Sequence, residues 1–400
     1  MEIRPTTDQD LDVLVDTFHA ALGRFPDTPP GGGGSWWSAL EMDRCLLATT
    51  ADGRVVGTAG AYSFELTLPG EVVVPVAGVT VVGVLPTHRR QGVLTAMMRH
   101  QLADLRARGE FLSVLLASEA AIYGRFGYGP ATYTSRLTVQ SHQGAFGRAR
   151  GTAPGSVEVL RRSECGEVLE EVYDRYRRAQ PGALSRPHRW WDLGAGQPPI
   201  SPAPRYIALH RDADGVPDGY ASYSLGDPGV LTVDETITTD DAVFTVLARF
   251  VLAHDLVTKV VIRHVPPGHP LRWQFEDFRA GEVGGDTDWL WVRLLDIPRA
   301  LAARGWSTDG ELVLDVVDPA LGEHGRYLLS VRDGAADCVA TDREPDLSLD
   351  VRDLGSVYLG GTAPSTLVRA GHIQAHHPRA AALADALFRT ERAPHCVHWF

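Results

Sequence analysis

The sequence predicts an α/β protein with more than one domain, followed by an α+β unit at its C-terminal end. Its 400 residues exceed the size at which one hydrophobic core keeps growing, which favours two or three domains. An apolar strand runs into a turn and a helix at Val81–Leu94, the unit from which α/β folds are built. Alternating strands from Glu311 to Thr341 precede a helix over Pro378–Phe388, which is the pattern of an α+β unit.

Composition and charge narrow the class of protein. A hydrophobic content of 44% with 22% charged residues is ordinary for a globular protein. No apolar run reaches the roughly 18 residues of a membrane span and the N-terminus lacks a secretory apolar segment, so we expect a cytoplasmic protein without a membrane partner. The net charge of −12 argues against a nucleic-acid partner and favours cationic molecules through long-range attraction. The cysteines lack CxxC spacing, which indicates a reducing compartment and no structural zinc.

The N-terminal region reads as a strand, a helix and the first strands of a sheet. Glu2–Pro5 is the expected first strand, and Asp8 or Asp10 is expected to cap an amphipathic helix that runs through Phe18–Leu22. Asp-Gly and Pro-Gly turn signals separate the strands that follow. These strands are expected at Arg44–Thr50, Arg54–Phe64 and Glu71–Val76.

A glycine-rich stretch, PDTPPGGGGSWW, interrupts this region after the first helix. It cannot hold regular structure, which suits a movable lip over a pocket. The aromatic residues Phe25, Trp36 and Trp37 either enclose a bulky substrate there or anchor the loop to the core.

The segment from Val81 to Arg108 carries the clearest functional signal. Val81–Leu85 is expected to be a buried strand that ends at Pro86, which lacks a backbone donor. A helix is expected to follow and to continue through Arg108, with unpaired backbone N–H groups at its positive end. Such oriented donors hold a phosphate group.

Residues His88–Gly92 form the turn before that helix. Gly92 permits close approach of the backbone to an anion, while Arg89 and Arg90 add charge and forked donors. Neither GxxxxGK(S/T) nor GxGxxG occurs here, so the turn is neither a Walker loop nor a dinucleotide fingerprint. The alternative is an ordinary connection with solvated arginines.

A central strand over Phe111–Ala117 is expected to run parallel to the Val81 strand through the helical crossover. Ser118 and Glu119 then lie where this strand meets the next helix. Ser118 either caps that helix or contacts a ligand.

Two motifs identify a family resemblance. The sequence RRQGVL at 89–94 resembles the acyl-CoA signature (R/Q)xxGx(G/A) of the GNAT acetyltransferases, apart from Leu94 at its last position. The sequence SEAAIYGRFGY at 118–128 and the terminal Phe400 resemble the Eis (enhanced intracellular survival) family of N-acetyltransferases, in which Leu at that last position is usual. The resemblance extends over essentially the whole chain and is strongest between Val81 and Tyr128.

The resemblance implies tandem GNAT-like acetyltransferase domains followed by a sterol carrier protein-like C-terminal domain. The expected bounds are 1–150 for the catalytic domain, 151–295 for a degenerate second GNAT-like domain, and 296–400 for the domain that supplies the C-terminal carboxylate. A second arginine-rich turn is not found, so one active site per chain is expected. Sterol carrier domains also leave open a lipid-binding role.

The later regions contribute elements rather than motifs. In the second domain we expect strands at Ser156–Leu160, Tyr220–Leu225 and Val230–Ile237, a hairpin over Arg205–Asp218 turning at Asp214-Gly215, and helices near Cys165–Arg178 and Asp240–His254. A linker or boundary is expected near Asp296–Arg304. Strands at Glu311–Val317, Gly325–Arg332 and Ala335–Thr341 follow it.

The resemblance also implies the residues of the site. Acetyl-CoA, with no metal, is the expected co-substrate, bound by Val82, Gly83, Val84, Arg89, Arg90, Gln91, Gly92, Val93, Leu94, Thr95, Ser118 and Glu119. Tyr123 is the expected general acid, and the α-carboxylate of Phe400 is the expected general base. Backbone N–H groups near Val84 are expected to polarise the thioester carbonyl. Phe25, Trp36 and Trp399 are expected to contact the substrate.

The expected activity is direct acetyl transfer to an amine of a polycationic small molecule, with aminoglycosides as the leading class. The alternatives are acetylation of a protein lysine or a polyamine, and a lipid-binding module with vestigial CoA affinity. Cys396 with His395 or His398 is a weaker nucleophile candidate. The group His372, His376 and His377 is a weaker metal candidate, since Pro378 interrupts its helical spacing and no HExxH motif occurs. A homo-oligomer, expected to be a hexamer, follows from the family alone.

Overall fold

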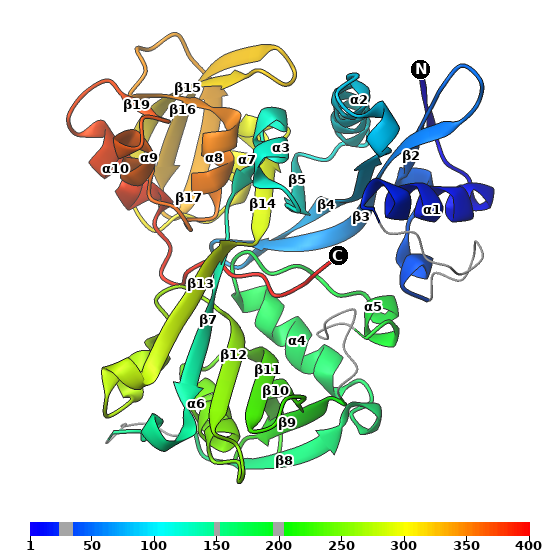
Figure 1. Cartoon of the computed structure of the whole chain (residues 1–400). Helices are drawn as coiled ribbons and strands as arrows, with labels where there is room; N and C mark the ends of the chain where they lie inside the picture. Colours follow the sequence, from blue (N-terminus) through cyan, green and yellow to red (C-terminus); the bar gives the residue numbers. More distant parts are fainter. Residues whose placement is uncertain (24–34, 148–152, 195–203) are drawn as a thin grey trace. The chain divides into compact units, whose positions relative to one another are not determined.

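The computed structural model of the chain describes residues 1–23, 35–147, 153–194 and 204–400 (Figure 1). The described residues divide into two compact units. The first unit comprises Met1–Ala131, Leu290–Thr390 and Phe400, and the second comprises Thr132–Trp289 and Glu391–Trp399. These units group the chain by packing, and the domain bounds expected at residues 150 and 295 stay predictions.

Within the described part of the first unit, a seven-stranded sheet has the order β1-β2-β3-β4-β5-β14-β6. Its strands are β1 (Glu2–Pro5), β2 (Leu46–Thr49), β3 (Val55–Leu68), β4 (Val72–Val84), β5 (Leu112–Leu116), β14 (Leu290–Leu294) and β6 (Gly129–Pro130). β4 and β5 pair in parallel, as expected, whereas their neighbours pair antiparallel. The separate strands expected at Glu71–Val76 and Val81–Leu85 are wrong, because the long β3 pairs along one continuous β4.

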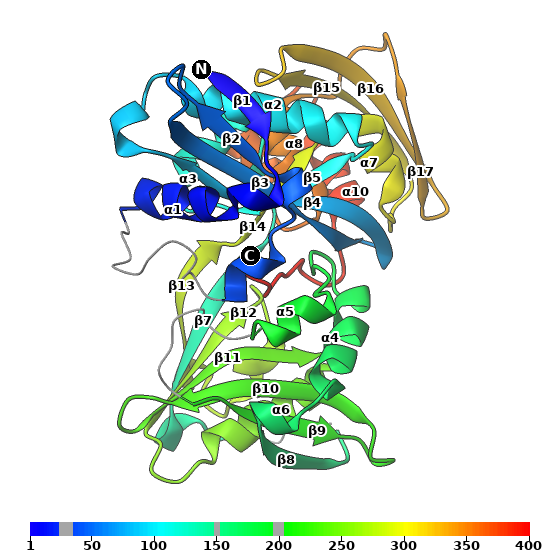
Figure 2. The same ribbon diagram turned by 90° about the vertical axis from the view of Figure 1, so that its right-hand side faces the viewer.

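Helices cover both faces of this sheet (Figure 2). The helices of the first unit are α1 (Leu11–Ala21), α2 (Val93–Ala107), α3 (Ala120–Tyr123), α7 (Ile297–Ala303), α8 (Val351–Tyr358), α9 (Pro364–Arg369) and α10 (Ala380–Phe388). Leu14 of α1 shares a buried cluster with Leu47 of β2, whereas Met97 of α2 shares one with Ala48, the next residue of that strand. Successive strand residues point to opposite faces, so α1 and α2 lie on opposite sides of the sheet.

Asp10 is the N-cap residue of α1, as one of the two predicted alternatives has it, but its side chain does not cap the helix. The carboxylate of Asp10 makes no capping bond to α1; it accepts hydrogen bonds from the backbone N–H and hydroxyl of Thr7 and pairs with Arg4 at 2.7 Å. This pairing lowers the pKa of Asp10 well below its ordinary value, chiefly through the hydrogen bond from Arg4. Asp10 therefore fixes the turn before the helix.

The rest of the first unit is the α+β part that the sequence predicts. A five-stranded sheet among the described residues has the order β17-β16-β15-β18-β19. Its strands are β15 (Gly310–Asp318), β16 (Glu323–Arg332), β17 (Ala335–Ala340), β18 (Leu347–Asp350) and β19 (Gln374–Ala375). The segment Asp296–Arg304, expected as a linker or boundary, is not an irregular linker, because it forms α7 with its caps, and the Asp296 carboxylate accepts from the N–H of Arg299 at 3.0 Å.

Helix α8 joins this α+β part to the first sheet at two glycines, beside β14 in Figure 1. A Cβ added to Gly355 would collide with the carbonyl of Val292, and one added to Gly129 would collide with the carbonyl of Arg352. Backbone therefore packs directly on backbone. The two sheets of the first unit are held in one packed body by contacts that only glycine permits.

In the second unit, the described residues form a seven-stranded sheet of order β13-β7-β12-β11-β10-β9-β8. Its strands are β7 (Tyr133–Gln140), β8 (Ser156–Arg161), β9 (Tyr206–Arg211), β10 (Pro217–Leu225), β11 (Val230–Thr238), β12 (Lys259–Val265) and β13 (Gly281–Asp288), and its helices are α4 (Val168–Ala179), α5 (His188–Asp192) and α6 (Asp241–Leu252). The predicted hairpin turn is confirmed, with Gly215 at a φ of 81°. Asp240 caps α6 by accepting from the N–H of Ala242.

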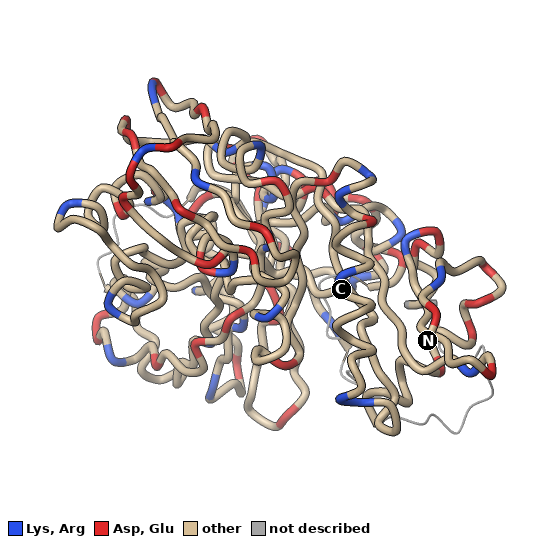
Figure 3. The backbone as a smooth tube through the Cα atoms, turned by 90° about the horizontal axis from the view of Figure 1, so that it is seen from above, with Lys and Arg blue, Asp and Glu red and all other residues tan. Residues whose placement is uncertain are grey.

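Charge is interspersed along the chain. Acidic and basic positions are intermingled along the tube in Figure 3, so the net charge of −12 is a distributed surplus of acid. Within the described ranges, no helix is long and apolar enough to cross a membrane.

Candidate active site

Strand β4 contains a β-bulge close to the predicted acyl-CoA turn. In its pairing with β3, Thr80 faces Gly60 and Gly83 faces Thr58, so two residues of β4, Val81 and the next one, oppose a single residue of β3. Val81 has a left-handed φ of 46°, a conformation that is costly for a β-branched residue. The structure therefore maintains a strained backbone at this point.

The bulge reverses which face of the sheet each side chain meets. Ala77 and Val79 belong to the buried cluster that contains Met98 of α2, whereas Val81 belongs to the cluster of α1. In a regular strand all three alternate residues would share a face. The inserted residue thus changes the face of the sheet to which the side chains of β4 point, just before the turn.

The backbone of β4 opens toward β5 beyond the bulge. The parallel pairing between these strands ends with Val79 opposite Leu115. Farther along, the N–H of Leu85 donates to the carbonyl of Val56 in β3, so the alternate residues Val82 and Val84 direct their backbone groups toward the β5 side. The expected binding of acetyl-CoA by Val82 and Val84 requires such exposed backbone groups.

The turn after β4 has the backbone of an anion site. Arg90 and Gly92 have left-handed φ values of 61° and 83°, and α2 begins at Val93 with Gly92 as its N-cap residue. The first N–H groups of a helix lack intrahelical acceptors, and the positive end of the helix dipole favours an anion there. These residues therefore fit the pyrophosphate of acetyl-CoA.

The two arginines of the turn differ. The guanidinium of Arg89 donates to the carbonyl of Ala21 at 2.6 Å and to that of Val84 at 3.4 Å, which ties the end of α1 to the turn. Arg90 is exposed, and Gln91 donates to the carbonyl of Thr87 at 3.2 Å. Both arginines are expected to contact the phosphate, and Arg89 has a structural role as well.

Tyr123 is the last residue of α3, one helical turn after the N-cap residue Glu119. Glu119 is the N-cap residue of α3 but makes no capping bond, and the hydroxyl of Ser118 bonds to the phenol of Tyr123 rather than capping the helix. Burial raises the pKa of Tyr123, and the bond with Ser118 partly offsets this. The phenol is therefore protonated at neutral pH, as a proton donor must be.

A second buried tyrosine supports the first. The hydroxyl of Tyr128 lies 2.7 Å from that of Ser113, a residue of β5 that pairs with Ala77. The rings of Tyr123 and Tyr128 meet edge to face with centroids 6.3 Å apart. Burial raises the pKa of Tyr128, so this phenol is also neutral.

Phe400 is buried in the first unit. Its side chain is 8% exposed, and its ring contacts those of Phe64 and Tyr62, with centroid distances of 5.1 and 6.4 Å. A Cβ added to Gly78 of β4 would lie 3.0 Å from the Phe400 ring and closer still to the Phe64 ring. Gly78 therefore leaves room for the terminal ring against the strand.

Tyr123 and Phe400 approach the same part of β4 from opposite faces. Ala77 and Val79 share a buried cluster with Tyr123, and Gly78 between them points to the face that holds the Phe400 ring. Sequence reasoning identified both residues but not this relation, because no local pattern reports which face of a strand a distant residue meets.

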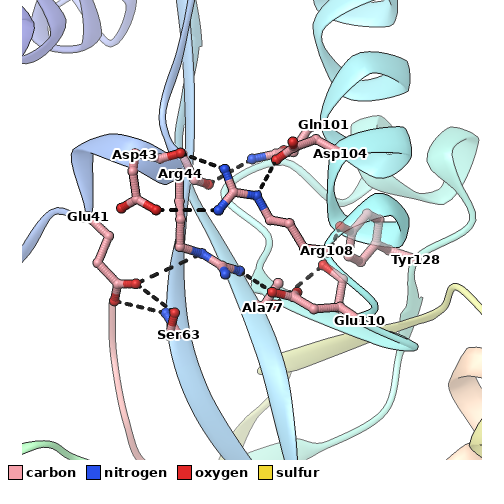
Figure 4. Close-up of polar contacts among 12 residues, drawn as sticks. Glu41, Asp43, Arg44, Ser63, Ala77, Gln101, Asp104, Arg108, Glu110 and Tyr128 are labelled. Atoms are coloured by element: carbon pink, nitrogen blue, oxygen red, sulfur yellow. Dashed lines mark hydrogen bonds and ion pairs between the residues drawn. The ribbon is translucent and has the colours of Figure 1, made fainter. Parts of the chain in front are cut away.

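A polar network holds the strand that carries Phe64 (Figure 4). Glu41 accepts hydrogen bonds from the N–H and hydroxyl of Ser63, at 2.9 and 2.6 Å, in the residue between Tyr62 and Phe64. Arg44 lies 3.9 Å from Glu41 and 2.5 Å from Glu110. Sequence analysis missed Glu41, because its partner is distant along the chain.

The tail before Phe400, residues 391–399, is docked in the second unit. The N–H of His395 donates to the carbonyl of Pro181 at 2.8 Å, and the amide of Gln180 donates to the carbonyl of Ala393 at 2.9 Å. Arg186 donates to His398 at 3.3 Å. Trp399 is 44% exposed, which leaves its predicted contact with substrate open to test.

The alternative nucleophile is not supported. Burial raises the pKa of Cys396 to about 12, so its thiol is protonated at neutral pH. Burial also lowers the pKa of His395 to about 3, which makes it a poor base. All four cysteines are buried and free.

The aromatic lip is only partly described. Phe25 lies outside the described residues, and so does the side chain of Trp36. Trp37 packs edge-on against Phe18 and His19 of α1, with centroid distances of 5.7 and 5.3 Å. Trp37 therefore anchors the loop to the core.

The three histidines weighed as metal ligands have separate partners. His372 lies 3.3 Å from Asp353, His376 lies 2.8 Å from Ser348, and His377 lies 2.8 Å from Asp346. Over the residues that the structure describes, no group of three or more histidine, cysteine or acidic side chains is arranged to hold a metal ion.

Comparison with known families assigns a class to this arrangement. Residues 2–131 and 182–294 match models described as acetyltransferase (GNAT) domains, and residues 297–397 match a sterol carrier protein domain. With the opened strands and the helix-start turn, these matches define a GNAT acetyltransferase. The three matches confirm the predicted fold class. The two GNAT matches confirm the predicted enzyme class, and GNAT acetyltransferases use acetyl-CoA.

Whole-chain relatives then identify the family. The N-acetyltransferase Eis of Mycobacterium tuberculosis is 34% identical over 393 residues, 94% of each chain. An uncharacterized N-acetyltransferase of Streptomyces griseus is 35% identical over 379 residues, 91% of each chain. The crystal structure of Eis1 from Mycobacterium abscessus matches with a TM-score of 0.87 at 34% identity, covering 100% of both chains. The chain belongs to the Eis family of N-acetyltransferases, as predicted.

Proposed function

We propose that this acetyltransferase transfers the acetyl group of acetyl-CoA directly to an amine of a polycationic small molecule, with aminoglycosides as the first substrate class to test. The observation that carries the proposal is the approach of Tyr123 and Phe400 to one part of β4 from opposite faces. In a direct transfer, a base accepts a proton from the attacking amine and an acid donates a proton to the leaving sulfur, so two separate groups must act at one reaction centre.

The reaction then involves two proton transfers, and each has a donor and an acceptor. As the amine nitrogen forms its bond to the acetyl carbon, the carboxylate of Phe400 takes the proton that the nitrogen loses. As the carbon–sulfur bond breaks, Tyr123 gives its phenolic proton to the sulfur, so free CoA leaves as the thiol. The bond from Ser118 orients that phenol.

The acidic balance supports a cationic acceptor. With 50 acidic against 38 basic residues, the protein attracts amines that carry several positive charges. The exposed Trp399 and the lip residues Phe25 and Trp36 remain the proposed substrate contacts. We also propose a cytoplasmic location and a hexameric assembly, both to be tested in solution.

The decisive experiment gives the purified chain acetyl-CoA and three acceptors in parallel: an aminoglycoside, a polyamine and a lysine-containing peptide. Mass spectrometry counts the acetyl groups on each, and thiol release gives the rates. We expect the aminoglycoside to have the highest kcat/KM. Faster acetylation of the peptide or polyamine would replace the substrate class, and no transfer to any amine would favour the binding-module alternative.

Lipid carriage has less support from the structure. A hollow of about 220 Å³ in the α+β part is lined by charged residues that include Arg106, Asp318 and Glu323. A more open one of about 510 Å³ is lined by Asp315, His324 and Arg326 among others. Lipid sites are mostly apolar, so neither hollow suits an acyl chain.

A further inference from the structure

The bulge in β4 is held by two buried side chains. The hydroxyl of Thr58, on β3, donates to the carbonyl of Val81 at 2.7 Å, and Thr58 is fully buried. The amide of Gln101, on α2, donates to the carbonyl of Gly60 at 2.9 Å (Figure 4). Both bonds lie beside the two residues of β4 that oppose one residue of β3. Side chains of β3 and α2 thus stabilise the strained backbone of the bulge.

The bond from Thr58 fixes the direction of a peptide group. A trans peptide is planar and points its C=O and its N–H in opposite directions. The described residues contain no cis peptide bond, so the N–H of Val82 points away from Thr58, toward the β5 side of β4. There the pairing of β4 with β5 has already ended, at Val79.

We propose that Thr58 is a positioning residue for acetyl transfer: by holding the carbonyl of Val81, it aims the N–H of Val82 at the thioester carbonyl. This inference rests on the proposed placement of the thioester between β4 and β5. It replaces the general expectation of donors near Val84 with one donor and names the side chain that orients it. Thr58 itself touches neither substrate nor reacting atoms.

The strained conformation of Val81 is the reason that the hydrogen bond from Thr58 is needed. A β-branched residue with a left-handed φ costs of order 1–3 kcal/mol and persists only where its surroundings hold it. Without the hydroxyl, the buried carbonyl of Val81 loses its partner and the peptide gains freedom to rotate. A donor that is poorly aimed stabilises the developing negative charge on oxygen less well.

The test compares Thr58→Val, which keeps the shape and removes the hydroxyl, with Thr58→Ser, which keeps the hydroxyl. For Thr58→Val we expect kcat to fall at least about tenfold, short of the ~10²–10³-fold loss of a whole oxyanion donor. The KM for acetyl-CoA should rise only by the factor that the hydrogen bond to its carbonyl contributes to binding, because the pyrophosphate turn is untouched. Thr58→Ser should retain most of the wild-type kcat.

A measurement of coenzyme binding tests the same inference without an acceptor amine. S-ethyl-CoA lacks the carbonyl of acetyl-CoA, so the ratio of the two dissociation constants reports the hydrogen bond to that carbonyl. We expect wild type and Thr58→Ser to prefer acetyl-CoA, and Thr58→Val to lose this preference while binding free CoA normally. A merely structural role would weaken all three ligands together.

The outcomes separate this inference from the proposed function. Wild-type kcat and an unchanged binding ratio in Thr58→Val would overturn the role of Thr58, even if aminoglycosides prove to be substrates. Absence of amine acetylation by the wild type would overturn the proposed substrate, while the binding ratio would still decide the role of Thr58. If Thr58→Val does not fold, Thr58→Ser and Thr58→Ala form a second pair that differs only in the hydroxyl.

Discussion

The ring of Phe400 lies against the ring of Phe64, with centroids 5.1 Å apart and planes at 65°. Edge contacts of this kind add about 0.5–1.5 kcal/mol beyond burial. The last residue of the chain is thus a packed core residue, and Gly78 leaves the space in which it packs. The α-carboxylate that we propose as the general base therefore belongs to a residue whose ring is packed in the core.

Deleting Phe400 should remove the general base and lower kcat by about 10²–10⁴-fold, the usual contribution of such a group. Adding a few residues after Phe400 should have a similar effect, because the carboxylate then moves. The KM for acetyl-CoA should change little. Steady-state thiol release measures both constants.

Phe400→Leu is the matched control, since it keeps the carboxylate and shortens the apolar side chain. We expect it to retain far more activity than the deletion. Equal losses in the two variants would mean that the ring matters and the carboxylate does not.

Tyr123→Phe should lower kcat, because the departing sulfur loses its proton donor. Burial raises the pKa of Tyr123 above its ordinary value of about 10, so wild-type kcat should fall only in strongly alkaline solution, and this fall should be absent from the variant. Tyr128→Phe, which removes the neighbouring phenol that bonds to Ser113, is the control. Comparable kcat values for the two variants would exclude Tyr123 as the specific acid.

Arg90→Ala should raise the KM for acetyl-CoA several-fold, more so at low salt, without changing the melting temperature, because Arg90 is exposed. Arg89→Ala should lower the melting temperature as well, since Arg89 binds the carbonyls of Ala21 and Val84. Kinetics and thermal melts distinguish the two. Identical behaviour would contradict this division of roles.

The second unit contains a buried ion pair whose loss should be costly. Arg186 and Glu235 are 0% and 2% exposed at their side chains and lie 2.8 Å apart, and Glu235 also accepts a hydrogen bond from the hydroxyl of Tyr220. Arg186→Met alone should reduce the free energy of unfolding by about 3–5 kcal/mol, because it strands a buried carboxylate. Adding Glu235→Leu should recover much of this loss. Urea unfolding of both variants tests the expectation.

Acid should destabilise the second unit through its buried histidines. Burial lowers the pKa of His395 to about 3, against an ordinary value of 6.5. The unfolded chain therefore binds a proton at a higher pH than the folded chain, so stability is complete above pH 6.5 and falls as the pH drops toward 3. His395→Gln should flatten this dependence in urea titrations, and the exposed His142→Gln should not. Parallel slopes for wild type and His395→Gln would refute the assignment.

Local patterns in the sequence predict much of the fold. The largely buried strand β3, the turn at Asp214-Gly215 and the strands of the α+β part follow from apolar runs, periodicity and turn chemistry. The anion turn is also local, because a glycine at the start of a helix with neighbouring arginines is contiguous in the chain. Resemblance then supplied Tyr123 and Phe400.

Such patterns do not predict which sheet a strand joins. β14 is inserted between β5 and β6 of the first sheet, and β7 pairs with β12 and β13 of the second. Neither pairing leaves a trace in the periodicity of the strand itself, because hydrogen bonding between backbones is almost independent of sequence. The segment Asp296–Arg304 likewise reads as a linker until its capping bond is seen.

The sequence by itself determined the fold class and the family, and its resemblance to that family predicts the acetyl-CoA turn and the two residues expected to move protons. Tertiary structure alone decided that Val81 forms a strained bulge, that Thr58 and Gln101 hold it, and that Phe400 meets Gly78 on the face of β4 opposite Tyr123. The physical reason is that motifs are short-range, whereas the direction of a peptide group and the face of a strand are set by partners far away in the chain.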